Sequence, residues 1–323
     1  MRRTAFISSI LVALGLLPAA VGAAGSEHPI VYMGLNDADF DLFMLTPDGR
    51  RPIVTAAGHD CGPAIAVDGR LVFASAREGV MDLYLQTGPD AEPVRLTSSS
   101  VAALFPSWSP DGGWIAYGKD GAIWKMRPDD PSTEQRLTDA SSGLYHSAPV
   151  WSPDGAMIAY WVGADPIGLV PVPPSIWIVG ADGSDARPLI EDALEPAWHP
   201  DGTVIAFAST AGRAPGFSDL AAIDFDPDSG TVMTTTRRVL HGGAGAAFAP
   251  TYSPEGSLAY AYDPDGRALP ASLPNPGEGS HDLWVGGPEP SQIWVLGEAE
   301  ARTADPFGAS NPSFAPHAGW WGS

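Results

Sequence analysis

The chain is a succession of short apolar runs separated by turns rich in proline, glycine and aspartate. Within the runs, large apolar residues alternate with other residues, as in residues 123–127 (IWKMR) and 175–179 (SIWIV). Alternation with a period of two is typical of β-strands, and the frequent turns leave no room for long helices. The pattern therefore predicts an all-β fold of many short strands.

One segment recurs along the chain in a fixed register. Residues 106–117 read PSWSPDGGWIAY, 149–160 read PVWSPDGAMIAY and 196–207 read PAWHPDGTVIAF. Related copies begin at Pro63, Pro250 and Pro312, and successive starting prolines are 43, 43, 47, 54 and 62 residues apart. The first spacings match the ~40–45 residues of a four-stranded propeller blade. In the unit that begins at Pro106 we expect strands at 106–109, 114–117 and 123–127, and a fourth near 134–137.

The two ends of the repeat predict how the sheets close into a ring. Residues 29–34 (PIVYMG) match the second strand of a blade, but no first strand precedes them. Residues 311–316 (NPSFAP) match a first strand, but no full blade follows them. We therefore predict a six-bladed β-propeller of four-stranded antiparallel blades, in which the C-terminal strand completes blade one. Such closure protects the sheet edges from aggregation.

The N-terminus has the pattern of a secretory signal peptide. Arg2 and Arg3 precede an apolar run from Ala5 to Leu17, and small residues follow it. The run is shorter than the ~20 residues of a membrane-spanning helix. We expect residues 1–24 to be a signal peptide cleaved near Ala23 or Ala24, and residues 25–323 to form the propeller. The mature protein is then periplasmic or secreted, without membrane insertion.

The recurring P-x-W-S-P-D-G-x-x-I-A-[FY] segment resembles the repeats of TolB-like six-bladed β-propellers, which are related to WD-like repeats. The resemblance covers residues 29–321. It implies a periplasmic protein-binding scaffold, or the non-catalytic partner of a peptidase domain as in prolyl oligopeptidase relatives. TolB itself has an α/β domain before its propeller, and we expect that domain to be absent here. We also expect no hydrolase domain, since no G-x-S-x-G elbow follows the propeller.

Charge narrows the choice of partners. The chain has 38 Asp and Glu against 17 Lys and Arg, a formal net charge of −21. Such a surface repels nucleic-acid phosphates, so we expect no nucleic-acid partner, and it favours a basic one. Cys61 is the only cysteine, so no intrachain disulfide forms. We expect a monomer.

Loop lengths predict a binding face. The tight Pro-Asp-Gly turns at 110–112, 153–155 and 200–202 join the first and second strands of their blades, and their carboxylates cap local backbone N–H groups. By contrast, the loops between the second and third strands of blades four to six are long, at 161–175, 209–219 and 261–282. Function usually lies in loops on a rigid scaffold. We therefore predict that these loops form an apolar wall that binds a protein or peptide partner, and that Trp161 and Phe217 contact this partner. Alternatively, these loops pack on each other and cap the channel.

Polar residues just before the starting prolines form a second candidate site, at the mouth of the central channel. The ligand-binding candidates there are His59, Asp60, His146, Asp192 and Glu195. Two histidines and three carboxylates suffice for a divalent cation, so the alternative function is a metal-assisted lyase or hydrolase that acts on a glycan in the channel. However, the spacings follow the repeat, which favours solvated rim residues without a cofactor.

Two further motifs have structural as well as functional interpretations. Asp224, Asp226 and Asp228 have the spacing that opens a calcium loop, but Thr235 stands where an EF-hand has glutamate. A plain hairpin turn accounts for them equally well. Trp108, Trp151 and Trp198 occupy one equivalent position in three repeats, which predicts a core between blades rather than a sugar-stacking platform.

Overall fold

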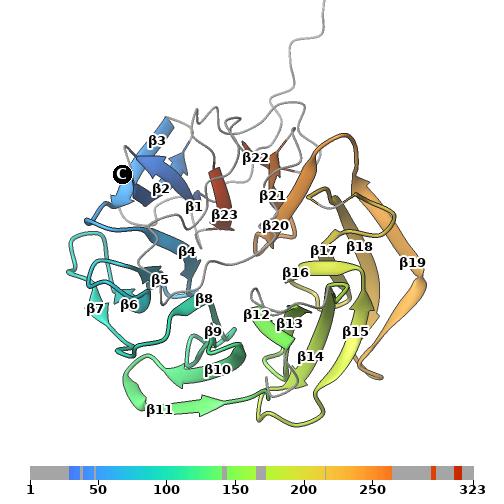
Figure 1. Cartoon of the computed structure of the whole chain (residues 1–323), viewed down its shortest axis with the longest axis horizontal. Coiled ribbons are helices and arrows are strands. Elements are labelled where there is room, and N and C mark those ends of the chain that lie inside the picture. Colours follow the sequence, from blue (N-terminus) through green and yellow to red (C-terminus); the bar gives the residue numbers. More distant parts are fainter. Residues whose placement is uncertain are drawn as a thin grey trace, which may run out of the picture.

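The computed structural model describes residues 29–36, 39–46, 49–139, 144–164, 172–214, 216–263, 292–295 and 309–314. Every regular element within these ranges is a β-strand. The strands form sheets arranged in a ring around a central axis (Figure 1). The expected signal peptide, residues 1–24, lies outside the described residues.

The described strands form six antiparallel sheets. Blade one consists of β23 (Ala309–Phe314), β1 (Ile30–Asn36), β2 (Asp39–Thr46) and β3 (Gly49–Val54), and blade two of β4 (Asp60–Ile65), β5 (Leu71–Ser75), β6 (Asp82–Gln86) and β7 (Val94–Arg95). Blade three consists of β8 (Ala103–Trp108), β9 (Ile115–Lys119), β10 (Ala122–Arg127) and β11 (Asp130–Arg136), and blade four of β12 (Leu144–Trp151), β13 (Met157–Ala164), β14 (Ser175–Gly180) and β15 (Arg187–Glu191). Blade five consists of β16 (Ala193–Trp198), β17 (Val204–Ser209), β18 (Asp219–Asp226) and β19 (Thr231–His241). The remaining sheet has three described strands, β20 (Ala246–Tyr252), β21 (Leu258–Asp263) and β22 (Gln292–Val295). The predicted all-β propeller is confirmed, with five complete four-stranded blades and three described strands of the sixth.

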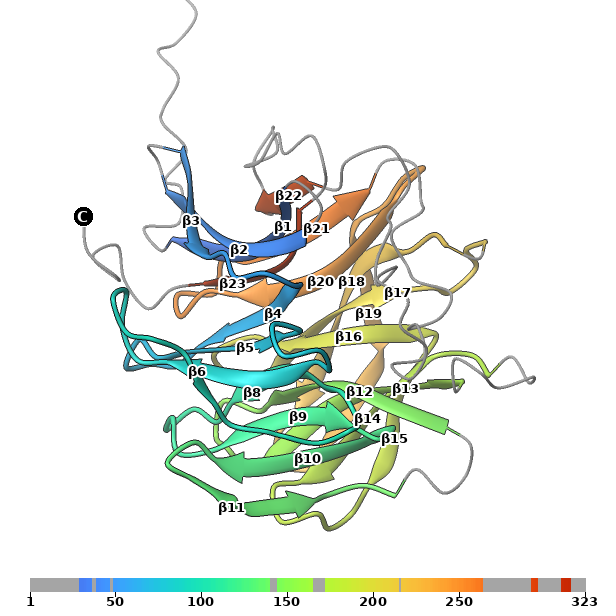
Figure 2. The same cartoon turned by 60° about the vertical axis from the view of Figure 1, so that its left-hand side comes forward.

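The C-terminal strand closes the ring as the sequence predicts. β23 pairs with β1 in antiparallel register, with Ile30 opposite Phe314 and Val31 opposite Ser313. The first blade therefore takes its innermost strand from the far end of the chain and its other strands from the beginning. β23 lies between β1 and the strands β20 and β21 of the last blade (Figures 1 and 2).

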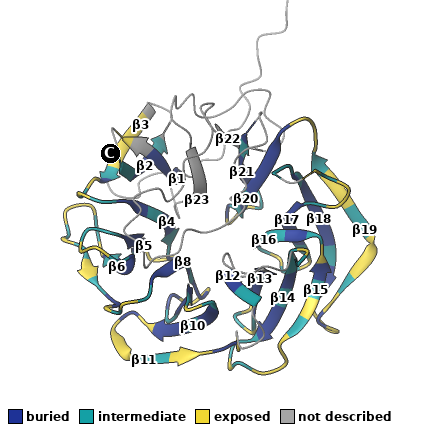
Figure 3. Cartoon of the chain, in the orientation of Figure 1, coloured by how far each residue is buried: buried dark blue, intermediate teal, exposed yellow. Residues whose placement is uncertain are grey.

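The core consists of apolar clusters shared by neighbouring blades. The aromatic residue near the middle of each second strand is fully buried, in the series Tyr32, Phe73, Tyr117, Tyr160, Phe207 and Tyr260. Trp108, Trp151 and Trp198 are also buried in these clusters, which confirms the predicted inter-blade role. Burial is concentrated on the inner strands, whereas β11 and β19 at the rim are largely exposed (Figure 3). Burying each large side chain contributes about 1.5–3 kcal/mol.

A β-bulge interrupts the innermost strand of five blades at the residue before the starting proline. This residue has positive φ in each of them: Gly62 (58°), Phe105 (53°), Ala148 (47°), Glu195 (51°) and Ala249 (47°). The strand register shifts at the same places. A proline disfavours the right-handed helical region for the residue before it, and a left-handed conformation costs a residue with a Cβ about 1 kcal/mol or more. The bulges therefore set the direction of the side chains that line the axis.

We expect the Ala148→Gly substitution to raise the free energy of unfolding by about 1 kcal/mol, because glycine adopts the left-handed region without a steric penalty. Urea denaturation of the two proteins measures the change. The matched control is Ala159→Gly on β13 of the same blade. Ala159 is fully buried and its φ is not positive, so there the substitution lowers stability. Equal destabilisation by both substitutions would show that the bulge carries no strain.

Candidate functional site

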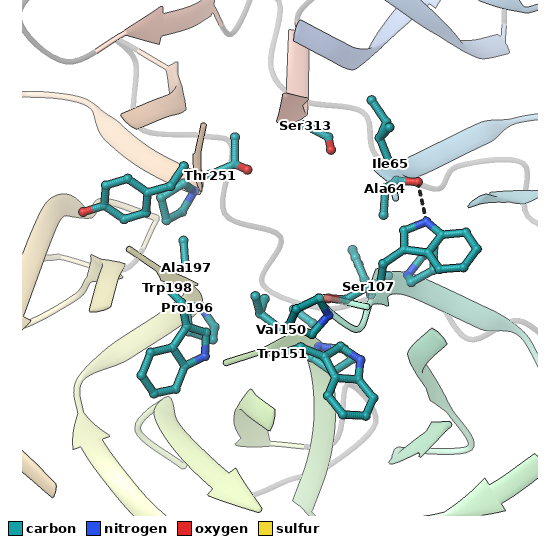
Figure 4. Close-up of a pocket in the computed structure, with 18 of the residues that line it drawn as sticks. Ala64, Ile65, Ser107, Val150, Trp151, Pro196, Ala197, Trp198, Thr251 and Ser313 are labelled. Carbon is teal, nitrogen blue, oxygen red and sulfur yellow. Dashed lines mark hydrogen bonds between the residues drawn. The ribbon is translucent and has the colours of Figure 1, made fainter. Parts of the chain in front are cut away.

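A cavity of about 710 Å³ lies on the axis of the ring, and all six innermost strands contribute to its wall (Figure 4). It extends from the bulge residues, such as Ala148 and Glu195, to the Pro-Asp-Gly turns, where Pro110, Pro153 and Pro200 line it. The sequence predicts function on the opposite face, around the long loops. The structure thus adds the turn side of the channel as a candidate site.

The cavity wall is rigid and mostly apolar. The starting prolines and turn prolines of several blades line it, together with alanines and the aromatic residues Trp108, Trp151, Trp198 and Tyr252. Proline has a fixed φ and no N–H group, so the wall loses little conformational freedom when a ligand enters and presents few backbone donors. Its polar side chains are mainly hydroxyls, such as those of Ser107, Thr251 and Ser313. Such a wall fits an apolar or extended ligand better than a polyanion.

Glu195 is the only charged side chain among the described residues that line the cavity. It is half-buried on β16, and its Oε2 accepts a hydrogen bond of 2.7 Å from the backbone N–H of Ala249 on β20. Burial raises the pKa of Glu195, and the hydrogen bond from Ala249 offsets only part of that effect. Of the ligand-binding residues predicted at the channel mouth, Glu195 alone lines this cavity.

His59 and His146 are buried inside their blades and do not line the cavity. His59 Nδ1 accepts a hydrogen bond of 3.1 Å from the backbone N–H of Phe40 in the preceding blade. His146 Nδ1 lies 2.8 Å from the Thr138 hydroxyl, and burial lowers the pKa of this histidine to about 4. Both histidines therefore have structural partners that fix the ends of strands.

Asp60 and Asp192 also have structural partners. Asp60 is fully buried and accepts a hydrogen bond of 3.0 Å from the Arg77 guanidinium. The backbone oxygen of Asp192 accepts hydrogen bonds from the N–H of Thr210 and from Arg237. Among the described residues, no three His, Cys, Asp or Glu side chains converge where they could hold a metal ion. The five predicted channel-mouth residues therefore do not supply three side chains to one metal site.

The acidic segment at Asp224, Asp226 and Asp228 forms a hairpin turn between β18 and β19. Asp226 accepts hydrogen bonds from the N–H of Asp228 and the hydroxyl of Ser229, and these bonds lower its pKa. Asp224 forms an ion pair of 2.7 Å with Arg238. The carboxylates of Asp224 and Asp226 thus bond within the hairpin, as the turn interpretation predicts.

Trp161 and Phe217 belong to the first two loops of the predicted wall, 161–175 and 209–219. Trp161 is half-buried on β13, its ring centre lies 6.2 Å from that of Tyr145, and a Cβ added at Gly163 would come within 2.7 Å of its ring. Phe217 is half-buried, 6.0 Å from the Arg213 guanidinium. Neither lines the axial cavity. Most of the wall falls on residues 165–171, 215 and 264–282, which lie outside the described residues.

Comparison with known proteins identifies the fold. No family model matches the chain. An uncharacterized protein of Agrobacterium fabrum is 27% identical over 115 residues, which are 35% of this chain and 39% of that protein. The match therefore spans about two fifths of the length of this curated relative.

Two solved structures match most of the chain. TolB from Acinetobacter baumannii is 17% identical, with a TM-score of 0.59 over 89% of this chain and 66% of that chain. A chain of a nidogen–laminin complex is 12% identical, with a TM-score of 0.60 over 89% of this chain and 98% of that chain. No helix among the described residues is long and apolar enough to cross a membrane. From its strand topology and these structural matches, the chain has the TolB-like β-propeller fold.

Proposed function

We propose that this protein is an exported, non-enzymatic propeller scaffold that binds a protein or peptide partner in the cell envelope or outside the cell. The observation that carries the proposal is the axial cavity. Its volume of about 710 Å³ lies within the ~300–1,000 Å³ range of ligand pockets. The proposal includes residues 1–24 as a signal peptide and residues 25–323 as the propeller.

The physical character of the cavity favours a peptide segment. Prolines make the wall rigid, so the conformational entropy lost on binding comes mainly from the peptide and not from the protein. Aromatic side chains and small residues such as Ala197 offer apolar contacts, and hydroxyls such as that of Ser107 offer hydrogen bonds. The matched nidogen–laminin structure is a protein–protein complex, which supports partner binding on this fold. The formal net charge of −21 favours a basic partner.

The cavity is tested by filling it. We expect Ser107→Trp and Thr251→Trp, which narrow the cavity from two blades, each to weaken peptide binding about tenfold or more, because the bulky ring excludes the ligand. The mature protein is purified from the envelope or culture fraction, where its intact mass should place the first residue near Ala24. Peptides selected from a random phage library on the unsubstituted protein are then titrated by fluorescence anisotropy.

Two comparisons make this test specific. The control is Val239→Trp on the outer strand β19, where Val239 is exposed and far from the axis, and we expect it to leave affinity unchanged. In a second variant, residues 163–174 and 265–279 are replaced by short Gly/Ser turns. Lost binding in that variant alone would assign the partner to the predicted loop wall, with Trp161 and Phe217 beside it. Unchanged affinity in both cavity variants would refute binding in the cavity.

A further inference from the structure

The Glu195 carboxylate has unused hydrogen-bonding capacity inside the cavity. A carboxylate offers about four lone-pair sites, and the N–H of Ala249 takes one of them. No Lys, Arg or His among the described residues forms an ion pair with Glu195. An ionised carboxylate that is partly removed from water and has no cation beside it loses favourable solvation. A ligand that brings a positive charge removes this cost on binding.

The residues equivalent to Glu195 leave space around it. Both neighbouring blades have alanine at this position, Ala148 on β12 and Ala249 on β20. The blade across the channel has Gly62, which has no side chain; β4 and β16 face each other over the cavity (Figures 1 and 4). The carboxylate is therefore reachable from the cavity, which these small residues do not fill.

We propose that the cavity binds a positively charged side chain of the partner segment, with arginine preferred over lysine, and that its guanidinium donates hydrogen bonds to the Glu195 carboxylate. This inference rests on the proposed function and specifies the chemistry of its ligand. A divalent cation such as Ca²⁺ needs six or more oxygen ligands, whereas one carboxylate is a full partner for a guanidinium. The planar fork of arginine also matches carboxylate geometry better than an ammonium does.

Binding should depend on pH through Glu195. A bound cation stabilises the ionised carboxylate, so affinity falls as the pH is lowered through the raised pKa of this residue. The other titratable groups on the flanking strands are Tyr145 and His146 on β12 and Tyr252 on β20. Burial raises the pKa of Tyr252 to about 12 and lowers that of His146 to about 4. These two groups therefore stay neutral between pH 5 and pH 8.

The test uses N-acetyl-arginine amide as the probe and the uncharged N-acetyl-citrulline amide as its isostere. Binding to the full mature protein is measured by NMR titration. We expect the arginine probe to bind roughly 10- to 100-fold more tightly than the citrulline probe, as for a charge-assisted hydrogen bond. Glu195→Gln should abolish that preference and also its decline as the pH is lowered. The control Asp228→Asn removes a negative charge from an exposed turn. It should change neither the preference for the arginine probe nor the pH dependence of that preference.

Each outcome bears on a separate claim. Equal affinity for the two probes, or an unchanged preference in Glu195→Gln, would overturn the role of Glu195. Phage selection then separates this from the proposed function. If the unsubstituted protein enriches peptides without Arg or Lys, and Glu195→Gln enriches the same ones, peptide binding stands and the charge inference fails. If no peptide is enriched, the proposed function fails, and the small probes alone decide whether the cavity holds a cation.

Discussion

Deletion of residues 310–323 is expected to lower the melting temperature by roughly 10 °C or more. The deletion removes most of β23, and with it the backbone pairing of Ile30, Val31 and Met33 on β1. It also leaves β1 as an open edge beside the last blade. Each lost ladder hydrogen bond costs about 0.5–1.5 kcal/mol, and exposure of the adjoining apolar cluster adds to the loss.

The cluster at this junction shows why the effect is large. Ile30 and Tyr32 of β1 pack in one group with Phe248 of β20 and Ala259 of β21, so the first and last blades share a core there. Differential scanning calorimetry of the mature chain with and without residues 310–323 measures the loss. The control is Ser313→Ala, which keeps the strand and its backbone pairing and should melt within a few degrees of the unsubstituted protein. Equal melting temperatures for the truncated and full chains would show that ring closure contributes nothing.

The positions of turns followed from the sequence more accurately than the limits of strands. In the repeat at Pro106, the expected strands 114–117 and 123–127 leave room for a turn between them, and the structure has one at Asp120 and Gly121, with φ of 52° and 65°. The predicted first strand, 106–109, is observed as β8 from Ala103 to Trp108. The difference arises at Phe105, where the bulge breaks the side-chain alternation while backbone pairing continues beyond it. Proline and glycine determine turns locally, whereas the length of a strand depends on the strand beside it.

The candidate site was only partly predictable, because the β-bulge decides which side chains point into the cavity. His146 precedes its starting proline by three positions and Glu195 by one, and both look like channel residues in the sequence. The bulge directs Glu195 into the cavity, whereas His146 is buried against Thr138. Residues of five blades share this left-handed conformation, yet they are glycine, phenylalanine, alanine and glutamate, so no residue type signals it. The available signal for the cavity was the turn proline that four repeats share just beyond the end of the innermost strand, at Pro110, Pro153, Pro200 and Pro254.

Arg77→Ala is expected to destabilise the protein by about 3–5 kcal/mol, the cost of leaving a buried charge without its partner. Asp60 is fully buried, and the Arg77 guanidinium donates to its Oδ1 at 3.0 Å. The N–H of Ala56 donates to the other oxygen at 3.3 Å, so Arg77 is the one cation bonded to this carboxylate among the described residues. Urea denaturation at pH 7.5 measures the loss. The control Arg127→Ala removes an exposed arginine that stacks on Trp114 and should cost far less.

A double variant and a pH series separate charge burial from lost packing, since Arg77 also lies 4.6 Å from the Tyr84 ring centre. In Asp60→Asn/Arg77→Ala the buried charge is gone, so most of the lost stability should return. Burial already raises the pKa of Asp60, so the folded chain binds more protons than the unfolded chain between the two pKa values. Stability from this group is therefore present at acid pH and declines as the pH rises through the raised pKa. The decline should be steeper in Arg77→Ala and absent from the double variant. If the double variant is as unstable as Arg77→Ala at every pH, the arginine acts by packing alone.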